Sequence, residues 1–555
     1  MTYTAKPISS LEKVFIDTAL DSLPLCDRHV MFRNQRLGYQ IALQYQSEAV
    51  RRPKMLTVEM KGALAPYTSV REVLQIPSLY PVSMSCHDEN YLRTEPGFYP
   101  DPLRPLHYRG QFCIPAGQAR SIWLEVELPE EFPAGEYKTD FSFIAEGGEA
   151  VCDASVTVRV LNAVLPPQKL IHTEWFYTDC IAEINHVKAF SEKHWKFIEN
   201  YLRVAVRNGI NMILTPVFTP ELDTYIGGER LTTQLAAITV TQKNRYAFDF
   251  SQLERWIDLC LSIGVKYFEI PHFFTQWGAK HAPKIVARVG NRTRRIFGWE
   301  TDALGKEYKC FLSQFIPALL DCLKKKGVDR QCFFHVSDEP HLDSLDHYKA
   351  CRELLTAYLG TDYPIIDALS DIDFYASGAS KKPIPGIKSI TPFLEKGING
   401  LWAYYCEAGG TVVTTGRQFA MPTARTRILG IQLWLANIEG FLHWGYNFYH
   451  NRYSYDIVHP LAETSGECFA PSGDAFLVYP DHDGSALESI RLNALREAMD
   501  DMRALDLVAE KKGRAYVEDL IRAQNGGKLP TFFDYPKDAS FLLDLRDRLA
   551  EELEP

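Results

Sequence analysis

The segment Gln331–His341, QCFFHVSDEPH, places a short apolar run directly before two adjacent carboxylates and a proline. A continuous apolar run of this length is typical of an interior strand of a parallel sheet, which is buried on both faces. Two neighbouring charges cannot be buried without partners, so Asp338 and Glu339 should lie where the strand opens into a loop or cleft. Pro340 disfavours helical geometry at Glu339, and we expect that residue to stay extended.

Seven further apolar runs alternate with helical stretches in the same part of the chain. They are KLIHTEWF (169–176), NMILTPV (211–217), VKYFEIPHF (265–273), YPIIDALS (363–370), IKSITPF (387–393), GLWAYYC (400–406) and GFLHWGYNF (440–448). One intervening helix is predicted from Ser191 to Asn208, ended by Gly209. This rhythm predicts an α/β fold with a (β/α)8 TIM-type barrel over residues 167–515, in which catalytic residues gather at the carboxyl ends of the strands.

The chain before Pro166 follows a different pattern. SIWLEVELPEEFPAGEYKTDFSFIAEG (121–147) and ASVTVRVLNAVLPP (154–167) alternate apolar and polar residues, with Pro and Gly turns between them. Alternation at period two is typical of antiparallel strands with one buried face. We therefore expect an N-terminal β-sandwich domain over residues 1–166, followed by the barrel and by a C-terminal helical extension over residues 516–555.

Composition excludes several classes of protein. The net charge of −10 and the absence of a Lys- and Arg-rich stretch with interleaved aromatics argue against a nucleic-acid partner. No run is long and apolar enough to span a bilayer, and the N-terminus lacks the features of a signal peptide, so we expect a cytoplasmic protein without membrane insertion. The 12 cysteines show no C-x-x-C spacing, which predicts buried thiols and no metal or other cofactor.

Other strand ends carry aromatic and carboxylate side chains that suit a sugar. Pyranose C–H faces lie against aromatic rings, while sugar hydroxyls need polar partners. The first, third, fifth, seventh and eighth runs and the long loops after the second and third runs supply the candidates for substrate binding, which are Trp175, Glu269, His272, Trp277, Trp299, Asp367, Tyr404, Tyr405, Trp444 and Asn447. His335, inside a strand, is expected to be a neutral core histidine.

These residues carry a resemblance to a known family. HVSDEP (335–340), LWAYYC (401–406), GFLHWGYNF (440–448), GDAFLVYP (473–480) and ALESIRLNALREAMDDMRAL (486–505) together resemble the domain-of-unknown-function 4091 group, which includes the glycoside hydrolase family 123 β-N-acetylgalactosaminidases. The resemblance covers roughly residues 170–510, and more loosely the predicted sandwich.

The resemblance implies a retaining hydrolase in which the substrate's 2-acetamido oxygen attacks the anomeric carbon and forms an oxazoline. Asp338 would then accept the acetamido N–H, and Glu339 would protonate the leaving oxygen and later activate water. A charge on Asp338 would favour the protonated form of Glu339. By the same resemblance Tyr404 or Tyr405 would bind the acetamido oxygen. From their positions along the chain, we expect Trp444 to form the floor of the site, Trp277 or Trp299 its lid, and Asn447 and Asp367 to hold hydroxyls.

The expected substrate is a small oligosaccharide or glycoconjugate with terminal N-acetylgalactosamine. Galacto over gluco specificity rests on the resemblance alone, and the oligomeric state stays open, a homo-oligomer included. Three alternatives also remain open. The first is a double-displacement glycosidase on a non-acetamido sugar, the second an inactive glycan-binding barrel, and the third a metal-dependent aldose isomerase using His272, Glu269 and Asp367. In the first alternative the nucleophile would be Glu269, Glu174 or Glu407.

Overall fold

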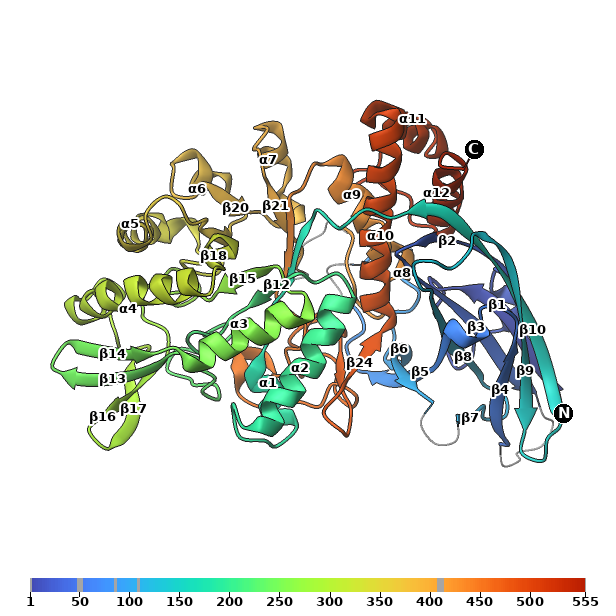
Figure 1. Cartoon of the computed structure of the whole chain (residues 1–555), viewed down its shortest axis with the longest axis horizontal. Coiled ribbons are helices and arrows are strands. Elements are labelled where there is room, and N and C mark those ends of the chain that lie inside the picture. Colours follow the sequence, from blue (N-terminus) through green and yellow to red (C-terminus); the bar gives the residue numbers. More distant parts are fainter. Residues whose placement is uncertain (1, 47–52, 84–86, 107–109, 407–413, 555) are drawn as a thin grey trace.

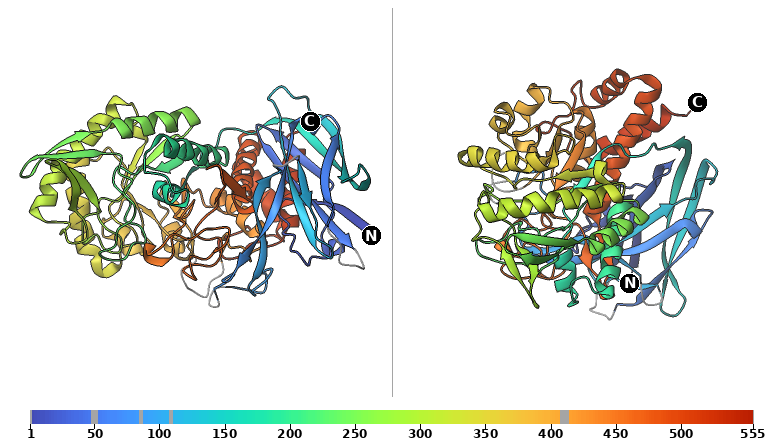
Figure 2. Two further views of the ribbon diagram at one scale, coloured as in Figure 1. Left: turned by 90° about the horizontal axis from the view of Figure 1, so that it is seen from below. Right: turned by 60° about the vertical axis from the view of Figure 1, so that its left-hand side comes forward.

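The computed structural model describes residues 2–46, 53–83, 87–106, 110–406 and 414–554 as a mixed α/β molecule. It is elongated, with two antiparallel-rich sheets at one end and parallel strands surrounded by helices at the other (Figure 1). The two further views show the long helix α10 (Ile490–Lys512) between these parts (Figure 2).

The N-terminal part is built from two sheets. One has the strand order β1 (Thr2–Ser9), β3 (Arg36–Gln46), β8 (Ala119–Glu127), β5 (Thr68–Ser78), β6 (Gly97–Pro105), β24 (Ala486–Ser489) and β23 (Tyr479–Pro480). The other has the order β2 (Arg28–Arg33), β10 (Ala150–Val164), β9 (Gly135–Ala145), β4 (Met55–Lys61) and β7 (Gln111–Cys113). Strands β23 and β24 come from far along the chain and extend the first sheet through β6.

The two sheets share one apolar core. Ile41 and Leu124 of the first sheet and Phe141 and Val158 of the second are buried in the same cluster. Along β9 the buried residues alternate with exposed ones, as the period-two pattern predicts. The alternation therefore places one face of each sheet against the other, and the opposite face toward solvent or the rest of the molecule.

The second part is built around two parallel sheets. Its larger sheet has the order β18 (Cys332–Phe334), β15 (Tyr267–Ile270), β12 (Met212–Leu214), β11 (Ile171–Glu174), β22 (Gly440–His443) and β21 (Trp402–Tyr404). A two-stranded parallel sheet, β19 (Ile366–Ala368) and β20 (Lys382–Ile384), is separate from it in the ladders. Isolated parallel bridges join Phe334 to Ile365 and Gly386 to Tyr404, so the small sheet lies between β18 and β21.

One of the eight predicted runs is not a strand. IKSITPF instead forms a 3-10 turn, Ile387–Ser389, and helix α7 (Thr391–Glu395), while the strand of that region is β20, just upstream. Pro392 occupies the first turn of α7, where its missing N–H has no intrahelical partner to lose. A short apolar run is compatible with both helix and strand, which explains the difference.

The helices cover the parallel strands and the C-terminal end. Helix α2 (Glu192–Arg207) begins at Ser191, whose hydroxyl accepts from the His194 N–H at 3.3 Å, close to the predicted bounds. The remaining helices are α1 (Thr178–Ile184), α3 (Ser251–Ile263), α4 (Lys306–Lys325), α5 (Leu345–Leu359), α6 (Ile372–Ala376), α8 (Thr423–Arg427), α9 (Leu429–Leu435), α11 (Arg514–Gln524) and α12 (Ala539–Glu551). Two hairpins, β13 (Ala237–Gln242) with β14 (Arg245–Asp249) and β16 (Ile285–Val289) with β17 (Arg292–Phe297), form a four-stranded sheet beside them.

A buried ionic cluster joins the two parts. Glu125 on β8 and Glu488 on β24 face Arg71, with N···O distances of 3.1 and 2.7 Å. Arg36 and Arg207 also contact Glu125, at 3.1 and 2.7 Å. Both carboxylates are almost fully buried, so the arginines must compensate for their lost hydration. We refer to these residues as the Glu125–Glu488 cluster.

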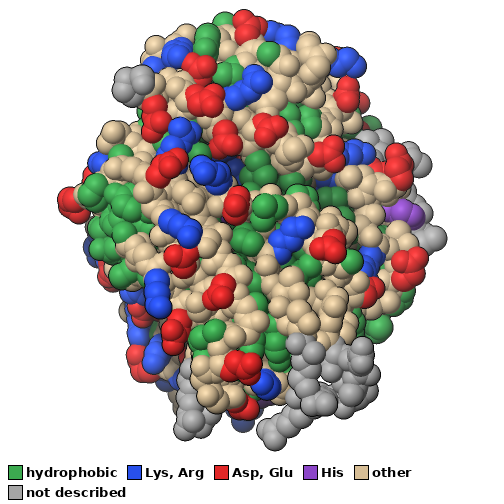
Figure 3. Space-filling view, turned by 90° about the vertical axis from the view of Figure 1, so that its right-hand side faces the viewer, with side chains coloured by type: hydrophobic (Ala, Val, Ile, Leu, Met, Phe, Trp, Pro, Cys, Tyr) green, Lys and Arg blue, Asp and Glu red, His purple; other side chains and the backbone are tan. Residues whose placement is uncertain are grey.

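The surface fits the acidic composition. On the face that carries the two-sheet part and the C-terminal helices, Lys and Arg side chains are interspersed with Asp and Glu (Figure 3). This face has no basic expanse that could follow a phosphate backbone. Within the described residues, no helix combines the length and the apolar character that crossing a bilayer requires.

Candidate active site

Asp338 and Glu339 form the turn that follows β18, on the way to α5. The backbone carbonyl of Asp338 accepts the Trp277 N–H at 2.9 Å, which ties the turn to the loop after β15. Glu339 has φ +38°, so it is left-handed and not extended as Pro340 led us to expect. A non-glycine residue in this region is strained by about 1–3 kcal/mol, and such strain concentrates at functional sites.

A pocket of about 380 Å³ opens over this turn. Its size falls within the range of about 300–1,000 Å³ that is usual for small-ligand sites. It brings together six of the residues singled out from the sequence, which are Trp175, Trp277, Asp338, Glu339, Tyr404 and Trp444. These residues come from the ends of β11, β18, β21 and β22 and from the loop after β15, so the parallel strands converge on one site as expected.

Tyr404 is directly engaged with the acidic pair. Its hydroxyl donates to Glu339 Oε1, and Ser370 Oγ lies 3.2 Å from the same hydroxyl. Burial, together with the charge of Glu339, raises the pKa of Tyr404 well above its usual value, so the hydroxyl stays a donor. In this state Tyr404 therefore holds the carboxylate of Glu339 in a fixed place on the pocket wall.

Burial acts strongly on one member of the acidic pair. Burial and the adjacent Glu339 charge raise the pKa of Asp338 well above its usual range, although the nearby His335 opposes the shift. Tyr404 donates to Glu339, so the two carboxyl groups also differ in their hydrogen-bond partners. The expectation that Glu339 carries the proton stays a prediction.

A buried network lies beneath the pair and contains three of the residues singled out from the sequence. His335 Nε2 lies 2.7 Å from Glu269 Oε1, and His335 Nδ1 lies 3.2 Å from Asp367 Oδ1. Glu269 also accepts the Trp175 indole N–H at 2.7 Å, and Asp367 accepts the Tyr348 hydroxyl at 2.6 Å. Glu269 and Asp367 are completely buried and do not line the pocket, so they position Trp175 and His335 and do not touch its contents.

His335 differs from the neutral core histidine predicted from its place in the strand. Burial alone would lower its pKa, but hydrogen bonds to Asp367 and Glu269 outweigh burial and raise the pKa to about 9. His335 is therefore an imidazolium below the acidic pair at neutral pH. The ring of His272 lies beside it at a tilt of 35°, with ring centroids 4.4 Å apart, and burial next to this charge lowers the pKa of His272 well below its usual value.

A second buried network explains two further carboxylates. Arg417 Nη1 donates to Glu174 Oε2 at 2.7 Å, and His443 Nε2 lies 3.6 Å from Asp474 Oδ1. Burial opposes the charge on Glu174, but Arg417, His172 and His443 together outweigh burial and lower the pKa of Glu174 to about 2. Glu174 is fully buried and does not line the pocket, whereas Asp474 does.

Three predicted contact residues act from behind the pocket wall. Tyr405 is buried against His443, with ring centroids 5.1 Å apart. Asn447 bonds both backbone groups of Tyr177, at 2.9 and 3.0 Å, and so fixes a residue that lines the pocket. Trp299 is 7% exposed, and its indole N–H donates to the Gly228 carbonyl at 3.1 Å, so it anchors a loop. Glu407 lies outside the described residues.

The pocket also contains residues that the sequence did not single out for this role. Asp223 and Gln276 lie on loops after β12 and β15, and the Asp223 N–H donates to Gln276 Oε1 at 2.6 Å. Burial raises the pKa of Asp223 to about 6. Tyr80 comes from the N-terminal part and reaches the same pocket. Its position after β5 gave no signal, because only the packing of the two parts brings it near the strand ends.

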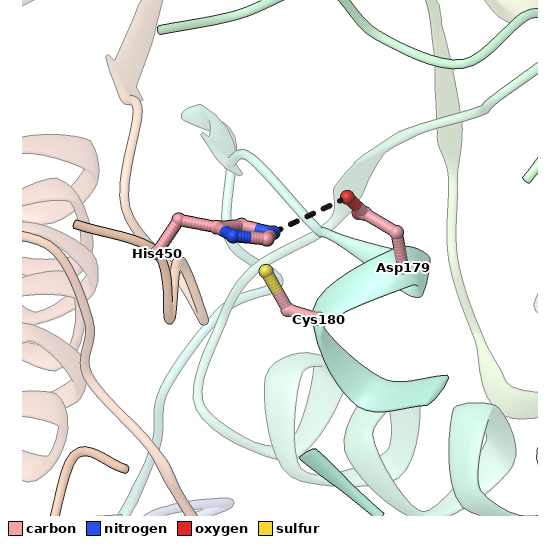
Figure 4. A group of neighbouring side chains, drawn as sticks. All are labelled: Asp179, Cys180 and His450. Atoms are coloured by element: carbon pink, nitrogen blue, oxygen red, sulfur yellow. Dashed lines mark ion pairs between the residues drawn. The ribbon is translucent and has the colours of Figure 1, made fainter. Parts of the chain in front are cut away.

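One group of side chains has the composition of a metal site. Donor atoms of Asp179, Cys180 and His450 lie within 4.8 Å of one another (Figure 4). Arg230 already lies 2.7 Å from Asp179 and donates to the Cys180 sulfur at 3.7 Å, while His450 lies 3.3 Å from Glu183. A metal ion here would lie close to the buried guanidinium of Arg230, and the two positive charges would repel each other. We interpret the group as a charge-balanced ion cluster that fixes α1.

A second candidate group, His272, His335 and Asp367, also has donor atoms within 4.8 Å of one another. Asp367 Oδ1 and both nitrogens of His335 are already used in the network beneath the pair. Two residues of the predicted isomerase centre, Glu269 and Asp367, are therefore already bonded to His335. The arrangement as a whole offers a half-buried acidic pair, a tyrosine donor and aromatic walls, which suits acid–base chemistry on a sugar.

Comparisons with known proteins agree with this chemistry. A family model described as the catalytic domain of glycoside hydrolase 123 matches residues 175–508. In structure the chain is similar to a family 123 glycoside hydrolase from Clostridium perfringens, studied for glycolipid glycan hydrolysis, with TM-score 0.75 and 16% identity over 99% of this chain and 98% of that chain. A β-glucuronidase from Parabacteroides merdae reaches a TM-score of only 0.30, at 10% identity over 85% of this chain and 50% of that chain. No curated protein sequence matches the chain.

Proposed function

This chain belongs to glycoside hydrolase family 123, and from that premise we propose that it is a retaining exo-glycosidase releasing β-linked N-acetylgalactosamine with the help of the substrate's acetamido group. The observation that carries the proposal is the adjacency of Asp338 and Glu339 on the wall of one pocket, with Tyr404 bonded to Glu339. One strand end can thus reach two neighbouring substrate atoms, the acetamido nitrogen on carbon 2 and the glycosidic oxygen on carbon 1.

The first step breaks the glycosidic bond. Protonated Glu339 gives its proton to the glycosidic oxygen as the bond to the anomeric carbon breaks, and the leaving group departs as an alcohol. The acetamido carbonyl oxygen attacks the anomeric carbon from the opposite face and closes an oxazolinium ring. Asp338 accepts the acetamido N–H, and its negative charge stabilises the positive charge that develops on this ring.

The second step restores the enzyme. Ionised Glu339 takes a proton from water, and the water oxygen attacks the anomeric carbon and opens the ring. Two inversions at the same carbon retain its configuration, and Glu339 again carries a proton. The protein supplies no covalent nucleophile in these two steps. Asp338 and Glu339 therefore act only as acid, base and stabiliser of positive charge.

The first step requires that substrate binding leaves Asp338 ionised. In the free site Tyr404 donates to Glu339, and Asp338 has the raised pKa. We infer that the incoming acetamido group donates its N–H to Asp338 and draws the Tyr404 hydroxyl to its own oxygen. Both changes favour an ionised Asp338 and a protonated Glu339, which is the state that the first step requires.

The pocket walls support a sugar ring. Trp175, Trp277 and Trp444 offer aromatic surface for its C–H faces, and Asp474 and Asp223 offer acceptors for its hydroxyls. The relative from Clostridium perfringens was studied for glycolipid glycan hydrolysis, which is consistent with a glycoconjugate substrate. We propose N-acetylgalactosamine as the sugar at this position.

We further propose that the eight parallel strands form one (β/α)8 barrel behind the pocket. The strands follow each other in chain order around the site, and the bridges of Phe334 with Ile365 and of Gly386 with Tyr404 support the placement of the small sheet between β18 and β21. Residues 1–166 would form a sandwich domain, 167–515 the catalytic barrel, and 516–555 a helical extension. Strands β23 and β24 would then be the barrel's own addition to the sandwich.

Hydrolysis of a nitrophenyl panel tests the proposed function. We expect wild type to cleave the β-N-acetylgalactosaminide and to be inhibited by a thiazoline mimic of the oxazoline, with no turnover of the plain β-galactoside or β-glucoside. Turnover of the plain galactoside would contradict substrate assistance.

A fluorosugar that traps a covalent adduct tests the competing double-displacement mechanism. Glu174 and Glu269 are both buried away from the pocket, so neither is placed as a nucleophile, but Asp223 and Asp474 also line it. Recovery of a sugar attached to either aspartate would establish that mechanism. Under our proposal no adduct forms.

A further inference from the structure

The pocket wall carries acidic side chains and no basic ones. Four carboxyl groups line it, those of Asp223, Asp338, Glu339 and Asp474. Among the described residues the lining includes no Lys, Arg or His, and its other polar side chains come from Tyr, Trp, Gln, Ser and Cys. A ligand with a negative charge would therefore enter a cavity that offers it no cation.

Asp474 contributes a buried charge with a free acceptor position. Its side chain is 2% exposed, and within the described chain Oδ1 has no hydrogen-bond partner. His443 Nε2 lies 3.6 Å from this oxygen, but burial beside Arg417 lowers the pKa of His443, so the imidazole is neutral at neutral pH. Burial opposes the charge on Asp474, yet the neighbouring histidine and two arginines outweigh burial and lower the pKa of Asp474. Asp474 is thus ionised, and Oδ1 can accept a sugar hydroxyl.

Asp223 contributes a second charge, on a loop that two other loops hold in place. Asp223 Oδ2 accepts the Tyr453 N–H at 2.9 Å, and the Asp223 N–H donates to Gln276 Oε1 at 2.6 Å. Ser454 Oγ also donates to the Asp223 carbonyl at 2.8 Å. Burial raises the pKa of Asp223 to about 6, so the group is a carboxylate above this pH. The position of this charge is therefore fixed before a ligand enters.

The buried arginines near these two aspartates lie behind the wall and are already paired. None of them lines the pocket, and each contacts a buried carboxylate at 2.7–2.9 Å: the pairs are Arg417 with Glu174, Arg491 with Asp101, and Arg230 with Asp179. Arg452 also acts on Asp223, but it is exposed, so solvent and salt screen its charge. Opposite charges held together largely cancel at a distance, which leaves the pocket with net negative charge.

The pocket is too small for an anionic ligand to avoid this charge. A roughly spherical cavity of 380 Å³ is about 9 Å across, comparable to the screening distance of about 8 Å in physiological salt. At about 7 Å and an effective dielectric constant of about 20, two like charges repel enough to change a dissociation constant roughly 50-fold. An anionic substituent anywhere on a sugar in the pocket is therefore repelled by both aspartates.

We propose that Asp223 and Asp474 are specificity-determining residues that restrict the pocket to uncharged sugars and exclude an acetamido sugar that carries an anionic substituent, such as a sulfate ester or a carboxylate at carbon 6. The inference rests on the proposed function, because it takes the acetamido sugar as the ligand. It goes further in naming the class of sugar that the pocket rejects and the two residues that reject it.

The test compares two sugars that differ in charge but hardly in size. One is methyl β-N-acetylgalactosaminuronide, with a carboxylate at carbon 6, and the other is the corresponding carboxamide. Each is measured as a competitive inhibitor of nitrophenyl β-N-acetylgalactosaminide hydrolysis at about pH 7.5, where Asp223 is ionised. We expect the inhibition constant of the carboxylate to exceed that of the amide about 10²-fold, with each aspartate contributing about ten-fold after partial screening at the pocket mouth.

Asparagine variants separate charge from shape. Asp474→Asn and Asp223→Asn should each lower the ratio of the two inhibition constants about ten-fold, because asparagine keeps the size and an acceptor oxygen but removes the charge. The double variant should combine the two reductions. Glu130→Gln is the matched control, because it removes one negative charge from the exposed turn between β8 and β9 and does not line the pocket. Its ratio should equal that of wild type.

The outcomes separate this inference from the proposed function. An amide that binds wild type no better than the carboxylate, a ratio unchanged in both aspartate variants, or an equal fall of the ratio in Glu130→Gln would overturn the role of the two aspartates. In each of these cases the proposed function stands, since wild type still hydrolyses the nitrophenyl substrate. Failure of wild type to hydrolyse that substrate would overturn the proposed function, and the specificity assignment with it.

Discussion

Two pairs of carboxylates in this molecule differ in the cations around them. At the pocket, no arginine within the described residues forms an ion pair with Asp338 or Glu339, and burial beside Glu339 raises the pKa of Asp338. In the Glu125–Glu488 cluster, burial also opposes the charges, but Arg71 and its neighbours outweigh it and hold the pKa of both glutamates below the usual range. The difference teaches that the cations around a carboxylate pair, and not burial alone, decide whether it can exchange a proton.

Among the variants that test this comparison, Glu339→Gln should have the largest effect, and that effect is on activity. Glutamine keeps the shape and the bond with Tyr404 but cannot give or take a proton, so we expect kcat/KM on the β-N-acetylgalactosaminide to fall about 10³-fold. The thermal midpoint should stay at the wild-type value or rise. A variant that keeps wild-type turnover would remove Glu339 from the role of acid.

Glu488→Gln, in the Glu125–Glu488 cluster, should lower stability and leave activity unchanged. Removing one partner leaves buried arginine charge uncompensated, so we expect the free energy of unfolding in denaturant to fall by about 3–5 kcal/mol. Turnover per folded molecule should be retained, because the cluster lies away from the pocket. Glu439→Gln is the matched control, since its contact with Lys382 is partly exposed and should be worth about 1 kcal/mol or less. Equal losses of unfolding free energy in Glu488→Gln and Glu439→Gln would contradict a stabilising role for the buried cluster.

Tyr404→Phe tests the pocket side of the comparison and should lower activity less than Glu339→Gln does. The change removes the hydroxyl that bonds Glu339 and that we expect to meet the acetamido oxygen, so kcat/KM should fall about ten-fold. Ser370→Ala, which removes the outer partner of the same hydroxyl and the acceptor of the Gly386 N–H, should cost less. A larger loss in Ser370→Ala than in Tyr404→Phe would mean that the serine, and not the tyrosine, acts on the substrate.

The smallest predicted effect is that of Asp338→Asn on the pH dependence of the free energy of unfolding. Because the pKa of Asp338 is raised in the folded protein, the native state binds more protons than the unfolded state between the two pKa values, and the free energy of unfolding falls as pH rises through this window. Asparagine does not titrate, so the variant should be more stable than wild type at about pH 8, with the advantage shrinking toward about pH 4.

The glutamate cluster should show the opposite sign. Its lowered pKa values mean that its stabilisation is present above the usual glutamate range and is lost as pH falls. Thermal midpoints of wild type, Asp338→Asn and Glu488→Gln from about pH 8 down to about pH 2 would measure both slopes. Parallel slopes in the two variants would contradict the contrast between the pairs.

Sequence patterns anticipated the elements better than the roles of single residues. The alternation in 121–147 and the apolar runs around 332–336 have one physical cause each, the burial of one face or of both faces of a strand. The run IKSITPF misled because an apolar stretch of that length fits helix and strand alike, and only its packing made it α7.

The candidate site shows the same limit. Neighbouring positions such as Glu174 and Trp175 point to different sides of the strand end, so one joins Arg417 and the other reaches the pocket. Trp299 and Asn447 have the composition expected of sugar contacts, yet they anchor loops. Tyr80 gave no signal, because its contribution depends on how the N-terminal part packs.

The sequence by itself determined which groups are adjacent along the chain. It places two carboxylates side by side after a buried strand, among alternating strands and helices. Covalent adjacency and periodicity are local properties, and they survive in any arrangement of the elements. Only the tertiary structure decided that Tyr404 meets Glu339 and that His335 is held between Glu269 and Asp367. These contacts join residues far apart in the chain, and their charges take effect only where packing excludes water.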